Sequence, residues 1–226
     1  MLKKAIVIGA SGAIGKALSN ECQKWGMSVV RLSRPEIDLS SEQSIIEVAS
    51  SLKATGESFD LILVATGILH TDSLKPEKNI KQIDAQNLHL LFQINAVGPL
   101  LVLKHFSGLL NPEERSVFAV LSARVGSISD NKLGGWYGYR ASKAALNMLL
   151  KTASIEYKRT LNTLIIAGLH PGTVDSKLSK PFQANVPRDE LFTPEFVAQQ
   201  LLQVIDHLKP EDSGYLFGWD GKKIDF

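Results

Sequence analysis

Short, almost wholly apolar runs alternate with longer stretches of helical spacing along this chain, and this alternation limits its fold more than any other feature. Apolar runs rich in β-branched residues indicate strands buried on both faces, which pair in parallel beneath covering helices. We expect strands at residues 5–8, 28–32, 59–64, 117–121, 164–167 and 215–217. We expect helices at residues 13–25, 40–54, 84–110, 141–157 and 194–208. The pattern therefore predicts an α/β protein, a doubly wound parallel sheet with helices on both faces.

Local signals refine this outline. Ser40, followed three residues later by Gln43, is a capping box that predicts the start of the second helix. Gly98-Pro99 predicts a bend in the third helix, and the polar segment at residues 71–83 is expected to be a loop. No repeat or linker interrupts the series, so one domain is expected over residues 1–226.

The composition excludes several classes of protein. A hydrophobic fraction of 44% in 226 residues is enough for a sizeable core. The net charge of +2, without a polybasic block, argues against a nucleic-acid or membrane-surface partner. The single cysteine, Cys22, excludes an intrachain disulfide framework, and the apolar run at residues 5–8 is too short for a signal peptide or a membrane span. We therefore expect a cytoplasmic enzyme, and the spacing of the five histidines predicts no metal site.

A glycine-rich turn, Gly9-Ala-Ser-Gly12-Ala-Ile-Gly15, joins the first expected strand to the first helix. Glycines here let the backbone turn sharply, approach a pyrophosphate and pack the helix on the sheet, while the amides at the helix start favour phosphate. A tight turn without a ligand is the alternative, but the position after the first strand favours a Rossmann-type dinucleotide site. The residues expected to bind the cofactor here are Gly9, Ser11, Gly12, Ala13, Ile14 and Gly15.

The end of the second strand bears on the choice of cofactor. A carboxylate there would bind the adenosine ribose 2′-hydroxyl, whereas an arginine would accommodate a 2′-phosphate. The sequence is Arg31-Leu-Ser-Arg34, with no carboxylate before Glu36. Ser33 and Arg34 are therefore expected to contact NADP(H), with NAD(H) as the alternative cofactor and a solvated edge as the alternative role of the arginines.

Tyr139 and Lys143 are one helical turn apart at the start of a helix, so that the phenol and the ammonium can share a face. A tyrosine pKa near 10 makes a poor proton donor or acceptor around neutral pH, and a nearby cation lowers that pKa. This pair is therefore a candidate for acid–base catalysis. An exposed pair of that spacing without a catalytic role is the alternative.

The order of several motifs is more specific than any one of them. The motifs are the glycine turn, Ala65-Thr66-Gly67, Asn95, a strand end with Ser122, the Tyr139/Lys143 pair, and His170-Pro171-Gly172. In this order they resemble the short-chain dehydrogenase/reductases. The runs at residues 126–131 and 134–139 are similar to those of the C-factor-like and sniffer-type carbonyl reductases, and the resemblance extends over nearly the whole chain.

The resemblance implies an NAD(P)-dependent oxidoreductase acting on CH–OH or C=O groups. Tyr139 would exchange a proton with the substrate oxygen while NADPH delivers hydride, and Lys143 would lower the tyrosine pKa and hold the nicotinamide ribose. Asn95 would support a water near the lysine. The implied catalytic residues are Asn95, Ser122, Tyr139 and Lys143, and the implied cofactor contacts are Asp38, Leu39, Ala65, Thr66, Gly67, Asn95, Tyr139, Lys143, Pro171, Gly172, Val174 and Ser176.

Three positions depart from the family pattern. Ala13 replaces the middle glycine of the turn, Gly12 standing one place earlier, and Ala65-Thr66-Gly67 lacks the frequent asparagine. Alignment on Gly126 places Ala123 where the family has its catalytic serine. Ser122 or Ser127 substitutes for that serine, or the enzyme is slow, since one lost preorganised donor costs about 10²–10³-fold in rate.

Substrate and assembly are less constrained. A small carbonyl or alcohol substrate is expected, under a mobile lid at residues 177–192. The resemblance implies a homodimer or homotetramer, since the long middle helices, residues 84–110 and 141–157 here, commonly form dimer faces in relatives. His70 and His170 end strands and could touch substrate, although a polar loop role is favoured. Trp136 and Tyr137 could wall the substrate site or simply pack.

Two other functions are open to the chain. One is a signalling or regulatory protein that binds NAD(P)H with weak catalysis, which Ala123 permits. The other is a sugar-nucleotide epimerase or dehydratase, but these enzymes need a substantial C-terminal domain and only about 50 residues follow His170. The carbonyl reductase is the favoured reading.

Overall fold

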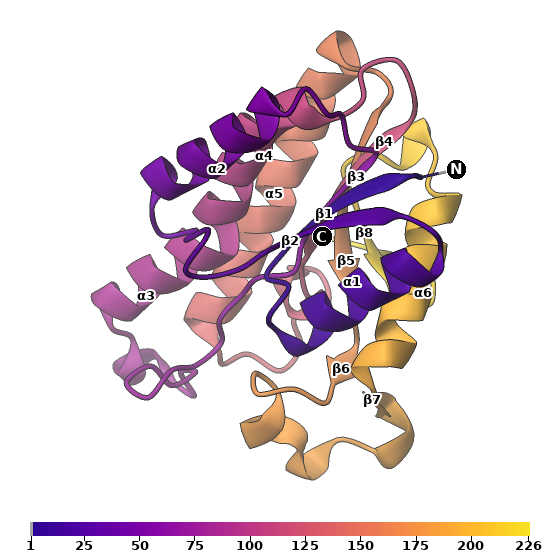
Figure 1. The fold of residues 1–226 in the computed structure, drawn as a ribbon. Coiled ribbons are helices and arrows are strands. Elements are labelled where there is room, and N and C mark those ends of the chain that lie inside the picture. Colours follow the sequence, from indigo (N-terminus) through magenta and orange to yellow (C-terminus); the bar gives the residue numbers. More distant parts are fainter. Residues whose placement is uncertain (1) are drawn as a thin grey trace.

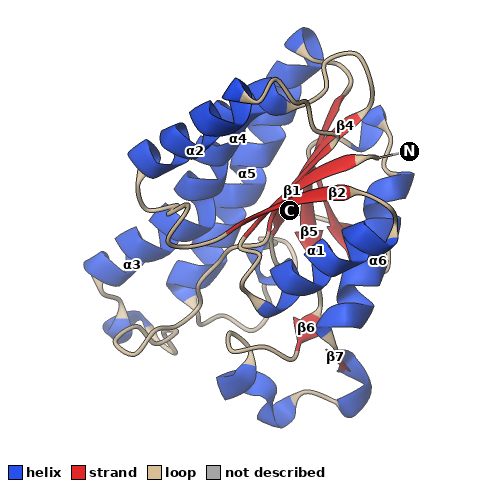
Figure 2. Ribbon diagram, viewed as in Figure 1, coloured by secondary structure: helices blue, strands red, loops and turns tan. Residues whose placement is uncertain are grey.

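Seven strands form one twisted sheet in the order β2-β1-β3-β4-β5-β8-β9 in this computed structural model, which describes residues 2–226 (Figures 1 and 2). All neighbours are parallel except β9, which pairs antiparallel with β8. The strands are β1 Lys4–Ile8, β2 Ser28–Leu32, β3 Leu61–Val64, β4 Ser116–Leu121, β5 Leu164–His170, β8 Tyr215–Gly218 and β9 Lys223–Ile224. Two further strands, β6 Thr173–Val174 and β7 Leu191–Phe192, form a small parallel pair of their own.

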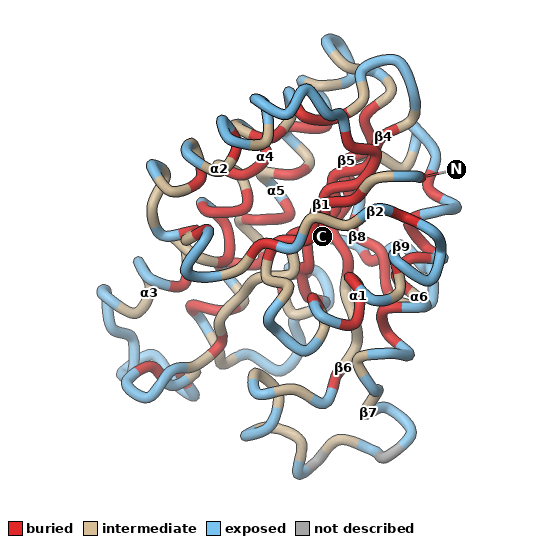
Figure 3. Tube along the Cα trace, viewed as in Figure 1, coloured by how far each residue is buried: buried red, intermediate tan, exposed pale blue. Residues whose placement is uncertain are grey.

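Helices cover both faces of the large sheet (Figure 1). α1 Ala13–Lys24 and α6 Pro194–His207 pack on one face, and α2 Glu42–Ala54, α4 Gly98–Phe106 and α5 Tyr137–Thr160 pack on the other. The strands are buried along most of their length (Figure 3), as expected for a parallel sheet between two helical layers. The predicted fold class is confirmed.

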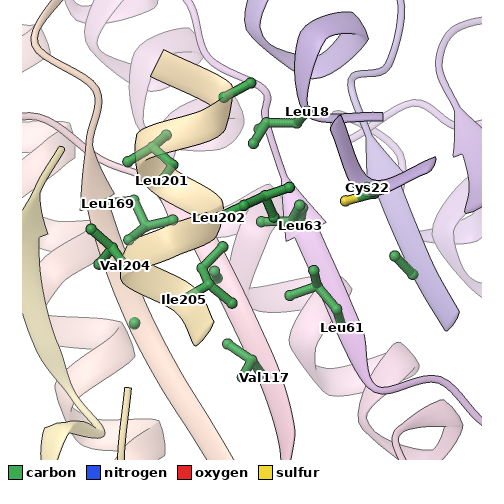
Figure 4. Close-up of a cluster of buried hydrophobic side chains, with 14 of the residues drawn as sticks. Leu18, Cys22, Leu61, Leu63, Val117, Leu169, Leu201, Leu202, Val204 and Ile205 are labelled. Atoms are coloured by element: carbon green, nitrogen blue, oxygen red, sulfur yellow. The ribbon is translucent and has the colours of Figure 1, made fainter. Parts of the chain in front are cut away.

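One of the two cores lies between the sheet and the α1/α6 layer (Figure 4). Leu18 and Cys22 of α1 and Ile205 of α6 pack with Leu63 and Val117 of the central strands. Cys22 is fully buried, and burial raises the pKa of its thiol to about 12. The lone cysteine is therefore a core residue.

The third predicted helix is irregular directly before Gly98-Pro99, where a bend was expected. α3 Ala85–Phe92 runs into a π-helical turn, Gln93–Val97, before α4 begins at Gly98. Pro99, which follows within the same continuous helix, has no N–H to donate to the carbonyl oxygen of Asn95 four residues earlier, so the irregular turn directly precedes the proline. A Cβ on Gly98 would come 2.8 Å from the Cβ of Leu39, so this glycine allows the close approach of the loop after β2.

The helical stretch Ala85–Leu109 is long and apolar enough, by length and composition alone, to cross a membrane. Its buried side chains, among them Val102, Leu103 and Phe106, belong to the core on the α2/α4/α5 face of the sheet. Packing on the sheet accounts for its apolar character.

Other boundaries also differ from expectation. α2 is capped by Ser41, whose hydroxyl accepts from the amide of Ser44, while Ser40 donates to the carboxylate of Asp38. α5 begins four residues before the predicted helix start, and β5 continues to His170. Both extensions carry the chain to the end of the sheet where the site lies.

Candidate functional site

The strand order creates a crevice at the carboxyl end of the sheet. From β1 the chain moves outward to β2 and then returns to the other side of β1 as β3, and ligands of open α/β sheets bind at such a switch point. A cavity of about 580 Å³ lies there. A second hollow, of about 500 Å³, lies near residues 107–112 and contains none of the predicted site residues.

The cavity gathers fourteen of the twenty-one predicted site residues, from segments far apart in the sequence. They are Ser11, Gly12, Ala13, Ile14, Ala65, Thr66, Gly67, Ser122, Tyr139, Lys143, Pro171, Gly172, Val174 and Ser176. The residues that do not line it are Gly9, Gly15, Ser33, Arg34, Asp38, Leu39 and Asn95, with Asn95 counted among both the predicted catalytic and cofactor-binding sets.

The glycine turn forms a cradle that larger residues would fill. Gly9 has a positive φ of 87°, and a Cβ there would lie 2.7 Å from the carbonyl oxygen of Ala65. A Cβ on Gly15 would overlap the carbonyl oxygen of Gly9. No side chain caps the start of α1 at Gly12, so the first-turn amides of this helix face the cavity without a capping side chain. This arrangement fits the diphosphate of a dinucleotide.

The two arginines after β2 have different surroundings. The guanidinium of Arg31 donates to the side chains of Asn20 and Gln23 on α1. Arg34 is exposed, near Asp38, whose carboxyl pKa is held below its usual range by hydrogen bonds from Ser40 and by Arg34. Of the two arginines, Arg34 is the one that protein contacts leave available to an anionic group.

Two other residues after β2 that were expected to contact the cofactor, Ser33 and Leu39, form hydrogen bonds within the protein. The hydroxyl of Ser33 accepts from the amide of Ser11 at 2.8 Å, which joins the end of β2 to the glycine turn. Leu39 is buried in the core on the α2 face, and its carbonyl oxygen accepts from Gln93. Leu39 thus supports the loop, and Asp38 is the more accessible of that pair.

Tyr139 and Lys143 lie in the first two turns of α5 and both line the cavity. The ammonium of Lys143 lies 5.9 Å from the centre of the Tyr139 ring and donates to the carbonyl oxygen of Leu121 at 2.9 Å. Burial raises the pKa of the Tyr139 phenol to about 12 and lowers the pKa of Lys143 to about 8. The lowered tyrosine pKa that was expected is wrong for this structure, because desolvation dominates at Tyr139. At neutral pH the phenol keeps its proton.

Asn95 lies in the π-helical turn, fully buried behind the cavity. Its side-chain amide accepts from the amide of Ile68 and donates to the carbonyl oxygen of Ile68 and to the hydroxyl of Ser142. A Cβ on Gly67 would come within 3.3 Å of the Asn95 side-chain oxygen and 3.5 Å of the Lys143 nitrogen. Asn95 therefore braces the loop after β3 against α5.

Ala123 stands where the family has its catalytic serine, and no neighbouring serine supplies the missing hydroxyl. Ala123 lines the cavity but offers no hydroxyl. Ser122 also lines it, yet its hydroxyl donates to the side-chain oxygen of Asn147 at 2.7 Å. Ser127 does not line the cavity, and its hydroxyl accepts from the amide of Asp130. Neither serine presents its hydroxyl proton where the family serine would stand.

An aromatic wall stands beside Tyr139. The ring of Trp136 lies 5.0 Å from that of Phe182 and 6.3 Å from that of Tyr139, measured between centroids. Trp136 has a positive φ of 51°, a costly conformation for a bulky residue, and it follows two glycines of positive φ. Trp136 lines the cavity whereas Tyr137 does not. Phe182 was not foreseen, because nothing local in the sequence marks it.

The start of α5 is held by a residue that the sequence did not mark. Glu77, in the segment expected to be a plain loop, is only 4% exposed. Its carbonyl oxygen accepts from the amide of Trp136 at 2.6 Å, and its carboxylate accepts from the amide of Gly138 at 3.2 Å. A carboxylate at a helix N-terminus is favoured by the helix dipole. Glu77 thus fixes the start of α5 just before Tyr139.

The segment expected to be a lid closes one side of the cavity. It consists of short 3₁₀ turns, Lys180–Asn185 and Arg188–Glu190, between β6 and β7. His70 does not line the cavity; its Nε2 lies 3.2 Å from the carbonyl oxygens of Lys177 and Leu178. His70 therefore ties the segment to the loop after β3.

Two polar groups of the cavity lining have no protein partner. The hydroxyl of Thr66 and the Nδ1 of His170 are buried without a hydrogen bond. Burial, with Arg124 nearby, lowers the pKa of His170 to about 4, so its imidazole is neutral at physiological pH. Buried polar groups are normally satisfied, and these two are candidates for ligand contacts. Within residues 2–226 no group of three or more His, Cys, Asp or Glu side chains could hold a metal ion.

Comparisons with known proteins identify the family of the chain. The family model described as short chain dehydrogenase matches residues 31–187, more than half of the chain. The chain is 28% identical to the 1-hydroxy-2-glutathionyl-2-methyl-3-butene dehydrogenase of Rhodococcus sp. (strain AD45), over 97% of this chain and 98% of the relative. It is 36% identical to the C-signal protein of Myxococcus xanthus over 63% of this chain and 80% of that protein.

A solved structure has the same fold. The NADPH-bound carbonyl reductase from chicken fatty liver superposes with a TM-score of 0.86 at 20% identity, covering 100% of this chain and 99% of the other. The carbonyl reductase Sniffer of D. melanogaster gives a TM-score of 0.79 at 19% identity, covering 100% of both chains.

Proposed function

Because the chain belongs to the short-chain dehydrogenase family and is an NAD(P)-dependent oxidoreductase, we propose that it reduces a ketone, aldehyde or quinone to the alcohol with NADPH. The observation that carries the proposal is the placement of Tyr139 and Lys143 in one cavity with the glycine turn. The alcohol is the substrate in the reverse direction. Residues 1–226 then act as one catalytic domain, with residues 177–192 as the lid.

In this proposal Tyr139 is the acid of the reaction. NADPH, when held by the glycine turn and Lys143, would supply the hydride that becomes the new C–H bond. The Tyr139 phenol gives its proton to the carbonyl oxygen, so that one C–H and one O–H bond form and the C=O π bond is lost. Lys143, with its nitrogen 5.9 Å from the ring centre, stabilises the phenolate that remains.

The residues of the cavity fit the cofactor. The glycine cradle and the uncapped start of α1 suit its diphosphate, and the unpartnered hydroxyl of Thr66 can serve its ribose or nicotinamide side. Lys143 lies behind Gly67, where a ribose hydroxyl could reach it. Pro171, Gly172, Val174 and Ser176 line the cavity at the end of β5 and would contact the nicotinamide.

We propose a preference for NADP(H), resting on Arg34. Replacing Arg34 with alanine should weaken NADPH binding by about tenfold or more, because the exposed guanidinium pairs with the 2′-phosphate, and leave NADH binding within about twofold. Arg31→Ala is the matched control, since that guanidinium is engaged by Asn20 and Gln23. Fluorescence titration of both cofactors measures the change. An equal loss for NADPH and NADH in Arg34→Ala would contradict the preference.

The cavity wall indicates the substrate class. Leu69, Val125, Trp136, Leu178 and Phe182 line it on the side of Tyr139. Apolar and aromatic walls bind apolar substituents, with few polar groups to fix orientation. We propose a carbonyl compound with aromatic or aliphatic substituents.

The proposed function is tested by NADPH oxidation. The purified protein is mixed with NADPH and a panel of aromatic and aliphatic ketones, aldehydes and quinones, with charged sugar and keto-acid carbonyls as controls, and the loss of NADPH absorbance is followed. Turnover of apolar carbonyls in preference to the charged ones supports the proposal. Stoichiometric NADPH binding without turnover of any panel member would refute it.

A second candidate function is favoured by one observation. Ala123 lines the cavity where the family serine would stand, and neither Ser122 nor Ser127 replaces its hydroxyl. A protein that binds NADPH and acts as a weakly catalytic regulator would tolerate this loss. Binding without turnover in the same panel is the result expected from that candidate.

A further inference from the structure

The cavity lacks the hydroxyl that would share the substrate oxygen with Tyr139. A developing negative charge on that oxygen needs preorganised donors, and the loss of one such donor costs about 10²–10³-fold in rate. Ala123 has no donor, and the hydroxyl proton of Ser122 is committed to Asn147. Another group has to supply the hydrogen bond if reduction is to be efficient.

His170 is placed to be that group. It is the last residue of β5, and β5 lies beside β4 in a register that pairs Leu121 with Leu169. The amide of Ser122 donates to the carbonyl oxygen of Leu169, so His170 comes level with the strand end that carries Ser122 and Ala123. His170 lines the same cavity as Tyr139.

No residue in the described range 2–226 forms a hydrogen bond with the His170 ring. Its Nδ1 is buried without a hydrogen-bond partner, although buried polar atoms are normally satisfied. The residue is partly exposed and lines the cavity, so the remainder of the ring is open to a ligand. A neutral imidazole carries one N–H donor, and either ring nitrogen can hold it.

The charges around His170 keep the ring neutral. Burial and Arg124 disfavour the imidazolium, and Asp220, which favours it, does not offset them. A neutral donor in a desolvated cavity can hydrogen-bond a carbonyl oxygen without giving up its proton. The transferable proton then comes from Tyr139 alone.

We propose that His170 is a further catalytic residue, donating a hydrogen bond to the substrate carbonyl oxygen in place of the serine that Ala123 has replaced. This inference rests on the proposed carbonyl reduction. It adds an assignment that the family pattern does not contain, since the polarising donor comes from the end of β5 instead of the end of β4.

The test is a double-mutant cycle between His170→Phe, which keeps an aromatic ring without the donor, and Ala123→Ser, which restores a hydroxyl. His170→Phe should lower kcat by about 10²-fold for the panel carbonyl that the wild type reduces fastest. Ala123→Ser should recover about tenfold or more in that background but raise the wild-type kcat by less than about threefold. His170→Asn, which keeps an N–H donor, should retain more activity than His170→Phe.

Two further measurements separate catalysis from folding. NADPH affinity by fluorescence titration and the midpoint of thermal unfolding should be nearly unchanged in all variants that support the inference. Wild-type kcat in His170→Phe, or effects of the two substitutions that simply multiply, would overturn the role of His170 while the proposed function stands. Turnover in Ala123→Ser but not in the wild type would also overturn it. Absence of turnover in both, with NADPH bound, would overturn the proposed function and this inference with it.

Discussion

Tyr139→Phe is expected to lower kcat for carbonyl reduction by about 10³-fold and to leave NADPH affinity within about twofold. The substitution removes the only proton that the proposal gives to the substrate oxygen, and a positioned general acid contributes about 10²–10⁴-fold. The ring itself is buried, only 8% exposed, and packs with Trp136, so phenylalanine preserves the wall of the cavity. The rate of NADPH oxidation at a saturating carbonyl concentration gives kcat, and a parallel titration with NADPH gives the cofactor affinity.

Tyr137→Phe is the matched control for this experiment. Tyr137 is two residues earlier in the same helical turn, but it is 39% exposed and does not line the cavity. The same loss of a hydroxyl should leave kcat unchanged there. Equal activity of Tyr139→Phe and the wild type would remove Tyr139 from the chemistry, whatever the cofactor affinity.

The six longer strands were predictable because strands buried on both faces have almost wholly apolar sequences, whereas the two-residue strands β6, β7 and β9 were not predicted. β1, β3 and β4 are buried on both faces, so runs such as Ala5-Ile-Val-Ile8 contain no polar residue to blur the pattern. Helix boundaries were less predictable, since Ser40 and Ser41 are both good caps and the choice between them depends on which hydroxyl is already hydrogen-bonded. Ser40 is engaged by Asp38, which leaves Ser41 to cap α2.

The π-helical turn illustrates what local signals omit. Gly98-Pro99 predicts a bend by the rules for isolated helices. The observed irregularity lies just before it, at Gln93–Val97, where the Asn95 side chain bonds both backbone groups of Ile68, twenty-seven residues away. A long-range contact of this kind has no local sequence signature.

The site residues also divide into those marked by local sequence and those placed only by long-range contacts. The residues of the glycine turn and of the Tyr139/Lys143 pair were identified because each set lies within a few residues of the sequence, where its spacing is visible. Glu77 and Phe182 belong to irregular segments and reach the site only through the fold. The direction of the Ser122 hydroxyl likewise depends on Asn147, on a different element.

Burial of the Lys143 ammonium lowers the free energy of unfolding of the protein. Its pKa is about 8 in the folded protein against an ordinary value of 10.5, and each pKa unit corresponds to about 1.36 kcal/mol. Between these two pH values the unfolded chain binds more protons, so stability rises with pH there. Below pH 8 the full cost, about 3 kcal/mol, is present, and above pH 10.5 it is absent.

Lys143→Met is therefore expected to raise the thermal unfolding midpoint at pH 7 while abolishing carbonyl reduction. Methionine fits the apolar path of the lysine stem but leaves the Leu121 carbonyl oxygen without its donor, which costs about 1–2 kcal/mol. The net gain of about 1–2 kcal/mol corresponds to about 2–6 °C for a chain of this size. Scanning calorimetry of the variant and the wild type at pH 7 and above pH 10.5 separates the charge from the packing, since at the higher pH the gain should be replaced by a loss of about 1–2 kcal/mol from the missing donor. Lys158→Met, exposed on the same helix, should shift the midpoint little at either pH. A midpoint that falls equally at both pH values in Lys143→Met would mean that the ammonium is not penalised by burial, and the ionisation assigned to this cavity would be wrong.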